Sequence, residues 1–326
     1  MISTLLFLVI GIAAVIKGAD WLVSGASSVA KRWGVSDLVI GLTIVAFGTS
    51  APELIVSVLA SWRGEVDIAI GNILGSNIAN ILLILGLAAM VYPLRVQSAT
   101  VWKEIPLSLL AIIALAVMVN DTVFDGASIS VLGRGDGIDL ILFFLIFMYY
   151  TFGLARSTSK SNGNQSDAQD AAEKVLSTGL AMIFIVLGLA LLALGGHMIV
   201  GSAVAIASAW GVSQALIGLT IVAVGTSLPE LATSIVAALK KKADIAVGNV
   251  VGSNIFNIFW ILGVSAIISP LPFNTAANFD VLMVMLATFL LFACMFVGRR
   301  HQLERWQGAT MVALYCAYLA YIVFRG

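Results

Sequence analysis

The sequence has few charged residues and few residues of the kinds that build catalytic or soft-metal sites. Lysine, arginine, aspartate and glutamate together make up 10% of the 326 residues, whereas 60% are hydrophobic and the mean hydropathy is +1.07. This composition excludes a soluble globular domain, whose surface requires more polar residues, and indicates an integral membrane protein. Because 17 basic residues balance 17 acidic ones, the net charge indicates no nucleic-acid partner.

Histidine and cysteine each occur only twice. Cys294 and Cys316 lie in separate apolar runs, with no histidine or aspartate at ligand spacing, so we expect them to be small core residues. We interpret His197 as a hydrogen-bonded core residue and His301 as part of a basic loop. An intramembrane metalloenzyme would need a histidine or cysteine ligand set, or a nucleophile with a base, and the sequence contains neither. We therefore predict that the protein is not an enzyme and needs no cofactor.

Ten apolar runs are long enough to cross the roughly 30 Å hydrocarbon core of a bilayer. The first has no basic residue before it and no cleavage site after it, so we interpret it as a membrane span and not a signal peptide. The one long hydrophilic stretch, 156–174, is too short to fold as a domain. The predicted spans are 2–30, 37–62, 67–92, 103–119, 137–155, 178–207, 214–239, 243–269, 278–297 and 307–324.

The two halves of the chain repeat each other with an offset of 177 residues, as from Glu53 to Glu230. Five spans in each half place the second half in the opposite orientation, which is the inverted-topology repeat of many secondary transporters. We therefore expect an all-α integral membrane protein of ten transmembrane helices, in two inverted five-helix repeats. The first repeat covers 1–155, a linker covers 156–177 and the second repeat covers 178–326.

The basic residues support the same number of spans. Thirteen lie in loops on one side of the predicted membrane, and only Arg63, Arg134 and Arg325 lie on the other. Because cytoplasmic loops carry more lysine and arginine, we predict that both termini are outside and that the linker is cytoplasmic. We interpret residues 240–242, three consecutive lysines, as an anchor that sets the topology and contacts lipid headgroups. Lys17 and Asp20 in the first span are interpreted as a mutual ion pair.

The repeated segments 41–54 and 218–231 each place a glutamate in the middle of a membrane span. An ionised carboxylate at that depth is costly, so each glutamate is a functional-site hypothesis by default. Glu53 follows Ser50 and Thr49 by three and four residues, and on one continuous helix these three side chains share a face. Each segment therefore indicates a patch of oxygen atoms within the membrane.

Prolines are rare in the chain, and two of them lie inside these segments. Pro52 lacks an N–H, so carbonyls near 46–48 are expected to lose their intrahelical donors, and Pro229 acts in the same way near 223–225. Freed carbonyls are tolerated at this depth only where they line a cavity or bind a ligand. The second and seventh helices are therefore predicted to be discontinuous at the midplane.

The spans that follow each glutamate add hydroxyl and amide oxygens. Ser76 and Asn80 form an i, i+4 pair, and Ser253 and Asn257 repeat it in the second half. Oxygen ligands without histidine or cysteine suit a hard cation such as calcium, which takes about six to eight oxygens. Two glutamates balance the charge of one calcium ion, of two sodium ions or of two protons. Because a loaded site is nearly neutral, the pattern favours exchange of cations over leak.

Four blocks of these segments resemble the sodium/calcium exchanger family of the cation/calcium antiporter superfamily, in its short prokaryotic form. They are GTSAPE at 48–53, GSNIAN at 75–80, GTSLPE at 225–230 and GSNIFN at 252–257. The resemblance implies a secondary antiporter that exchanges calcium for sodium across the prokaryotic plasma membrane by alternating access, with the first and sixth helices sliding as a pair. Its partners would be inorganic cations and membrane lipid, and we expect it to function as a monomer.

The resemblance also implies roles for individual residues. Glu53 and Glu230 would be the central calcium ligands, shared with a sodium ion. Further ligands would be Thr49, Ser50, Thr226 and Ser227 with the carbonyls of Ala46 and Ala223 at flanking sodium sites, and Ser76, Asn80, Ser253 and Asn257 completing the cage.

Asn257 stands where many exchangers have an aspartate, which removes a third carboxylate. The blocks also lack the GNAAE-type signature of the calcium/proton branch, so the second hypothesis is a divalent-cation/proton antiporter that uses the same two glutamates. A passive channel would conduct without a counter-ion, and the inverted repeat with broken helices favours alternating access instead.

Overall fold

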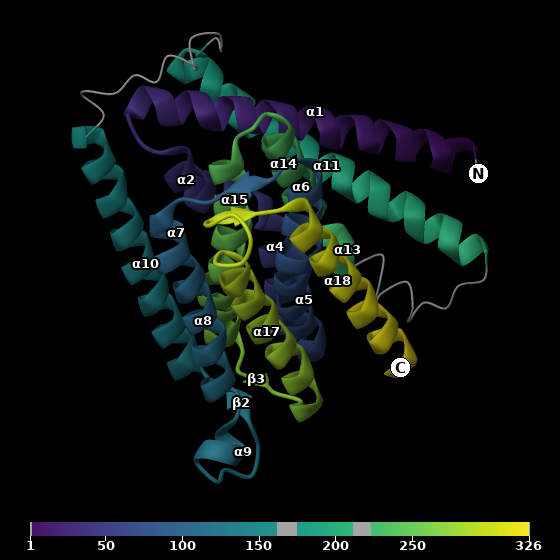
Figure 1. Ribbon diagram of the computed structural model, residues 1–326. Helices are drawn as coiled ribbons and strands as arrows, with labels where there is room; N and C mark the ends of the chain where they lie inside the picture. Colours follow the sequence, from purple (N-terminus) through teal and green to yellow (C-terminus); the bar gives the residue numbers. More distant parts are fainter. Residues whose placement is uncertain (1, 162–174, 211–222, 326) are drawn as a thin grey trace.

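The computed structural model describes residues 2–161, 175–210 and 223–325, and this part of the chain is almost entirely helical (Figure 1). The first half contains α1 (Ile2–Trp33), α2 (Asp37–Ile40), η1 (Gly41–Val45), α3 (Ala46–Thr49), α4 (Ala51–Arg63), α5 (Val66–Ile78), η2 (Ala79–Leu85), α6 (Gly86–Val91), α7 (Ser98–Trp102), α8 (Glu104–Met118), α9 (Asp121–Phe124) and α10 (Arg134–Ser161). The second half contains α11 (Thr178–Ala209), α13 (Ala223–Thr226), α14 (Leu228–Leu239), α15 (Ala243–Ile255), η4 (Phe256–Leu262), α16 (Gly263–Ile268), η5 (Thr275–Ala277), α17 (Asn278–Cys294) and α18 (Arg305–Arg325).

Eight helices in the described ranges are long and apolar enough to cross a membrane, and the bent pair Asp37–Thr49 with Ala51–Arg63 makes a ninth. The multi-pass prediction is therefore confirmed. Of the predicted seventh span, 214–239, the part up to 222 lies outside the described residues. The rest contains α13 and the shorter apolar helix α14.

The helix predicted over 137–155 is longer in the structure. It forms α10, which begins at Arg134 and ends at Ser161, so the first residues of the linker predicted over 156–177 are helical. The polar residues after 155 contain no proline or glycine before 162, and such residues extend a helix without difficulty.

Two short antiparallel strand pairs, which the sequence analysis did not predict, join the two halves of the chain. β1 (Leu94–Arg95) pairs with β4 (Gln302–Leu303), and β2 (Val131–Leu132) pairs with β3 (Leu271–Pro272). In Figure 1 the β2–β3 pair lies near α9, at the end of the bundle opposite α1. Each pair fixes a loop of one half against a loop of the other.

The centre of the bundle consists of two continuous helical rods, α5–η2–α6 and α15–η4–α16. In each rod, 78% of the residues in the 18-residue apolar segment are buried, compared with 33% for α1 and 28% for α11. These rods carry the GSN blocks, so the predicted amide ligands lie in the most enclosed part of the fold. Both rods contain a π-helical stretch at matched positions, Ala79–Leu85 and Phe256–Leu262.

α1 and α11 pack along each other and run across one end of the bundle (Figure 1). Glycines permit this approach: a Cβ added at Gly18 would lie 2.8 Å from the carbonyl oxygen of Gly188, and one at Gly11 would lie 2.9 Å from that of Gly195. Small residues at such a seam allow two membrane helices to pack backbone to backbone. The two long helices therefore behave as one unit.

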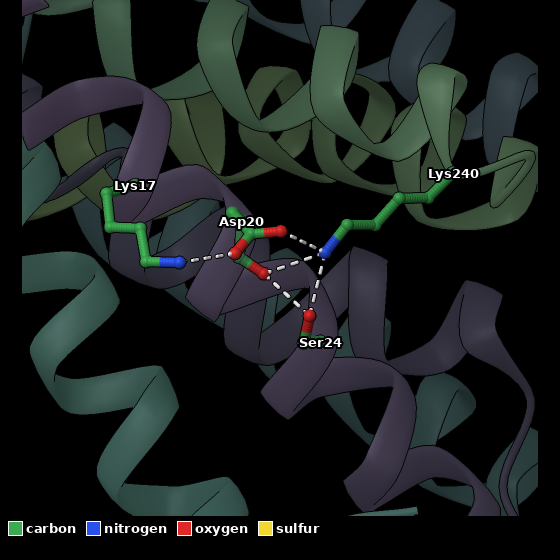
Figure 2. A network of polar contacts seen from close by, with 4 residues as sticks. All are labelled: Lys17, Asp20, Ser24 and Lys240. Carbon is green, nitrogen blue, oxygen red and sulfur yellow. Dashed lines mark hydrogen bonds and ion pairs between the residues drawn. The ribbon is translucent and has the colours of Figure 1, made fainter. Parts of the chain in front are cut away.

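One polar cluster connects α1 to the end of α14 (Figure 2). The predicted ion pair between Lys17 and Asp20 is confirmed, with Nζ and Oδ2 3.2 Å apart. Lys240 also contacts Asp20, at 2.7 Å from Oδ1 and 2.9 Å from the backbone oxygen, and donates to the Ser24 hydroxyl at 2.7 Å. Lys242 pairs with Asp37 at 3.4 Å. Lys240 and Lys242 therefore bind carboxylates of the protein, contacts that the sequence did not predict.

Two residues interpreted as core residues face outward. His197 on α11 and Cys316 on α18 are exposed, and Cys294 is half-buried. Lipid-facing and core-facing positions of a membrane helix are equally apolar, so the sequence does not distinguish the two faces.

Candidate functional site

Each glutamate lies in the first turn of a helix that begins at a break. The helical path of α3 ends at Ser50, whose φ and ψ are −81° and 7°, and α4 begins at Ala51. Pro52 is thus the second residue of α4, where an N–H would have no intrahelical acceptor, and Pro229 has the same place in α14. Glu53 is the third residue, where the helix macrodipole stabilises a negative charge.

The predicted discontinuity at the first of these segments is confirmed, with a bend of 47° between the two helical pieces. The predicted loss of backbone partners is wrong for Ala46. Its carbonyl accepts from the Ser50 N–H at 3.0 Å and from the Thr49 hydroxyl at 3.3 Å. The proline starts a new helix instead of interrupting a continuous one, and the Ala46 carbonyl keeps its backbone donor. Ala223 is the first residue of α13.

The serines next to the breaks contact the glutamate of the other half. Ser50 Oγ donates to Glu230 Oε1 at 3.0 Å, and Ser227 Oγ donates to Glu53 Oε1 at 3.1 Å. We expected these hydroxyls to share a face with the glutamate of their own segment. The break turns them away from that face, because Ser50 no longer continues the helix that carries Glu53. Each glutamate is therefore held by both halves of the chain.

Within each half, the GSN serine completes the contacts to Oε1. Ser76 Oγ donates to Glu53 Oε1 and Ser253 Oγ donates to Glu230 Oε1, each at 3.4 Å. Ser227 and Ser76 are also 3.2 Å apart between their hydroxyl oxygens. Both glutamates are 1% exposed. The structure thus brings the two acids and four predicted hydroxyls into one buried cluster.

Two asparagines that the sequence analysis did not single out as ligands bind the glutamate backbones. Asn249 Nδ2 donates to the carbonyl of Glu230 at 3.3 Å and to Ser234 Oγ at 3.0 Å, while its Oδ1 accepts from Thr49 Oγ1 at 2.9 Å. In the other half the corresponding contacts are Asn72 Nδ2 to the Glu53 carbonyl at 3.4 Å, Asn72 Nδ2 to Ser57 Oγ at 3.0 Å and Thr226 Oγ1 to Asn72 Oδ1 at 3.4 Å. The signal available in the sequence is the repeat itself, which matches Asn72 with Asn249.

Asn80 and Asn257 lie one turn beyond the GSN serines, inside the π-helical stretches. π-Helical turns are rare and occur often at functional sites. Both side chains are 1% exposed. Because Asn80 is four residues after Ser76, and Asn257 four after Ser253, each amide lies on the helix face that contacts a glutamate.

Four buried oxygens of this cluster have no hydrogen-bond donor among the residues that the structure describes. They are Glu53 Oε2, Glu230 Oε2, Asn80 Oδ1 and Asn257 Oδ1. An unsatisfied buried acceptor costs about 1–3 kcal/mol, and more when it is charged. A cation bound to any of them would supply the partner that it lacks. No group of three or more histidine, cysteine, aspartate or glutamate side chains suited to a metal occurs in the described ranges. The candidate cation ligands in this cluster are therefore the oxygens of two carboxylates, of amides and of hydroxyls.

Several known proteins with similar sequences are named as antiporters or exchangers. The family model described as "Sodium/calcium exchanger protein" matches residues 3–153 and 180–324. The putative antiporter CaxA of Alkalimonas amylolytica is 39% identical, with 99% of each chain covered. The sodium/calcium exchanger MaX1 of Methanosarcina acetivorans is 33% identical, with 98% of each chain covered. The Ca²⁺/H⁺ antiporter ChaA of Bacillus subtilis is 28% identical over 84% of this chain and 80% of its own.

The fold is also similar to a solved structure. The sodium-calcium exchanger NCX_Mj, soaked with 100 mM Na⁺ and 10 mM Sr²⁺, has a TM-score of 0.82 and 31% identity, with 98% of each chain covered. The family match covers both halves of the chain, including all four blocks that carry the site. The chain therefore belongs to the sodium/calcium exchanger family.

Proposed function

We propose that the protein is a secondary antiporter that exchanges calcium for sodium across the membrane by alternating access. The observation that carries this proposal is the set of four buried oxygens without donors, two of them on carboxylates. Calcium accepts carboxylate, amide and hydroxyl oxygens in flexible geometry, and this cluster offers all three. Calcium is the substrate, and Glu53 and Glu230 are its central ligands.

The charge of the cluster supports exchange over leak. Two ionised glutamates that are 1% exposed carry two negative charges out of water, which is unfavourable unless cations neutralise them. One calcium ion or two sodium ions restore neutrality. The empty site is therefore costly to enclose. The protein switches between its outward-open and inward-open states only when the site holds cations.

The further ligands of the proposal are the residues that the cluster gathers and the carbonyls beside the breaks. They are Thr49, Ser50, Ser76, Asn80, Thr226, Ser227, Ser253 and Asn257, with the backbone oxygens of Ala46 and Ala223. The exchange of contacts between halves, with Ser50 on Glu230 and Ser227 on Glu53, supports this shared cage.

We also propose the layout in the membrane. The chain forms ten spans in two inverted five-helix repeats, 1–155 and 178–326, with the linker in the cytoplasm and both termini outside. The matched π-helical stretches and the matched glutamate contacts support two equivalent halves. We also propose that the protein functions as a monomer in a prokaryotic plasma membrane.

The second candidate is a divalent-cation/proton antiporter that uses the same glutamates. The relative ChaA, a Ca²⁺/H⁺ antiporter, favours this candidate. Two protons neutralise the two carboxylates as well as one calcium ion does, so the cluster itself accommodates either coupling ion.

Calcium uptake into proteoliposomes separates these two candidates. Vesicles loaded with sodium and diluted into sodium-free medium should accumulate calcium, whereas vesicles with only an outward proton gradient should not. The reverse result would establish the proton antiporter. Uptake that is equal in both, and equal without any gradient of counter-ion, would contradict antiport altogether.

A further inference from the structure

Two further asparagines connect the amide ligands of the site to the opposite half of the chain. Asn80 Nδ2 donates to Asn254 Oδ1 at 2.9 Å, and Asn257 Nδ2 donates to Asn77 Oδ1 at 2.9 Å. Asn77 and Asn254 are 0% and 1% exposed and directly follow the GSN serines. Each pair therefore crosses from one central rod to the other.

These contacts determine which end of each ligand amide faces away from the opposite rod. A carboxamide has an acceptor end and a donor end, and only the acceptor end binds a cation. Because the amide nitrogens of Asn80 and Asn257 donate to the opposite rod, their oxygens remain without a donor in the described structure. A rotation by 180° would present an N–H group to the cation instead.

The orientation of Asn254 is itself fixed by the backbone. Its Nδ2 donates to the main-chain carbonyl of Asn77 at 3.3 Å, and a carbonyl can only accept. The Oδ1 of Asn254 must then face Asn80, which in turn must offer its nitrogen. The hydrogen bonds therefore run in one direction, from Asn80 to Asn254 and from Asn254 to the Asn77 carbonyl. In this arrangement the Oδ1 of Asn80 receives no hydrogen bond and can bind a cation.

Another asparagine pair in the same protein shows a different pattern. Asn120 and Asn278 also join the two halves, but each donates to the other, at 2.9 Å and 2.7 Å, so both amide oxygens are used. Asparagines that serve only to join helices can thus pair reciprocally. At the site each ligand amide uses only its nitrogen, which keeps its oxygen for another partner.

We infer that Asn77 and Asn254 are positioning residues that hold the Asn257 and Asn80 amides with their oxygens toward the transported cation. This inference rests on the proposed function. Neighbours of this kind, one shell outside the ligands, are worth about 10–100-fold in metal affinity in other proteins.

Asn254→Ala tests the inference, with Asn278→Ala as a matched control that breaks an asparagine pair away from the site. Both variants are reconstituted and calcium uptake is measured against calcium concentration. Asn254→Ala should raise the KM for calcium about tenfold or more, with the maximal rate changed much less. Asn278→Ala should leave the KM unchanged. A KM for Asn254→Ala within twofold of that for Asn278→Ala would overturn the inference.

A conservative variant separates positioning from packing. Asn77→Asp keeps an oxygen that accepts from Asn257, and the amide nitrogen that it removes has no acceptor in the described part of the chain. Asn77→Asp should therefore bind calcium at least as tightly as the wild type, whereas Asn77→Ala should bind it more weakly. Equal weakening in both variants would contradict a positioning role. Failure of the wild type to transport calcium would instead refute the proposed function, so the two failures are distinguishable.

Discussion

The two central rods and the outer pair α1–α11 are built from the same apolar residues but are held in place by different contacts. The rods are joined by buried hydrogen bonds between asparagines, and beside them Ser227, next to α14, donates to Glu53 of α4. The outer pair packs through glycine seams, and one polar cluster around Asp20 connects it to α14. Directional hydrogen bonds hold the centre, whereas the glycine seam holds α1 and α11 against each other through close backbone contacts. The molecule thus combines a precise centre, held by hydrogen bonds, with an outer pair held together by its own seam.

The largest effect should come from removing a charge at the centre. Glu53→Gln or Glu230→Gln leaves one carboxylate, which balances only half of the charge of a calcium ion. Calcium exchange should therefore fall by more than about 100-fold, while the protein remains folded. Calcium uptake by proteoliposomes measures the loss, and the elution profile in detergent reports folding.

Glu104→Gln is the matched control for these variants. Glu104 is also fully buried, but it lies on α8 and accepts from the Tyr150 hydroxyl. Exchange should survive this change. Calcium exchange that persists in Glu53→Gln would contradict the assignment of Glu53 as a central calcium ligand. An equal loss of exchange in Glu104→Gln would show that the effect is not specific to the carboxylates of the site.

A smaller change at the centre adds a charge instead of removing one. Asn257→Asp places a third carboxylate where an amide oxygen now has no donor in the described structure. A divalent ion gains more from the added charge than a monovalent one, so the preference for calcium over sodium should rise about tenfold. Competition of sodium against calcium uptake measures this ratio. An unchanged ratio together with unchanged dependence on membrane potential would place Asn257 outside the ion-binding shell.

The outer seam should respond through stability and not through ion binding. A Cβ at Gly188 would lie 2.8 Å from the carbonyl oxygen of Gly18, so Gly188→Ala should lower the free energy of unfolding by about 1–3 kcal/mol. Gly201 on the same helix has no described atom within 4 Å of an added Cβ, and Gly201→Ala is the control. Thermal unfolding in detergent compares the two. Equal melting temperatures would show that the seam tolerates a wider spacing.

The comparison also explains what the sequence could predict. Membrane spans depend on the length of apolar runs, which is a property of the chain in one dimension, so the eight or nine spans found in the described residues were predictable. The two acids and the asparagines were recognisable because burying polar groups in lipid is costly. The contacts from Ser50 to Glu230 and from Ser227 to Glu53 were not predicted, because they depend on how the two halves meet in space. The outward faces of His197 and Cys316 were missed because lipid is as apolar as the core.

The smallest effect should come from the polar cluster that joins the outer pair to the bundle. Lys240→Met removes the ammonium that contacts the Asp20 carboxylate, the Asp20 carbonyl and the Ser24 hydroxyl. Partly exposed ion pairs contribute about 0–1 kcal/mol, so the rate of exchange should change by no more than about fivefold. Because the ion site is not touched, the KM for calcium should stay constant. The neighbouring Lys241→Met, an exposed position, is the control. If Lys240→Met altered the KM as strongly as a change at the site, the cluster would belong to the precise centre, and the division between the two regions would be wrong.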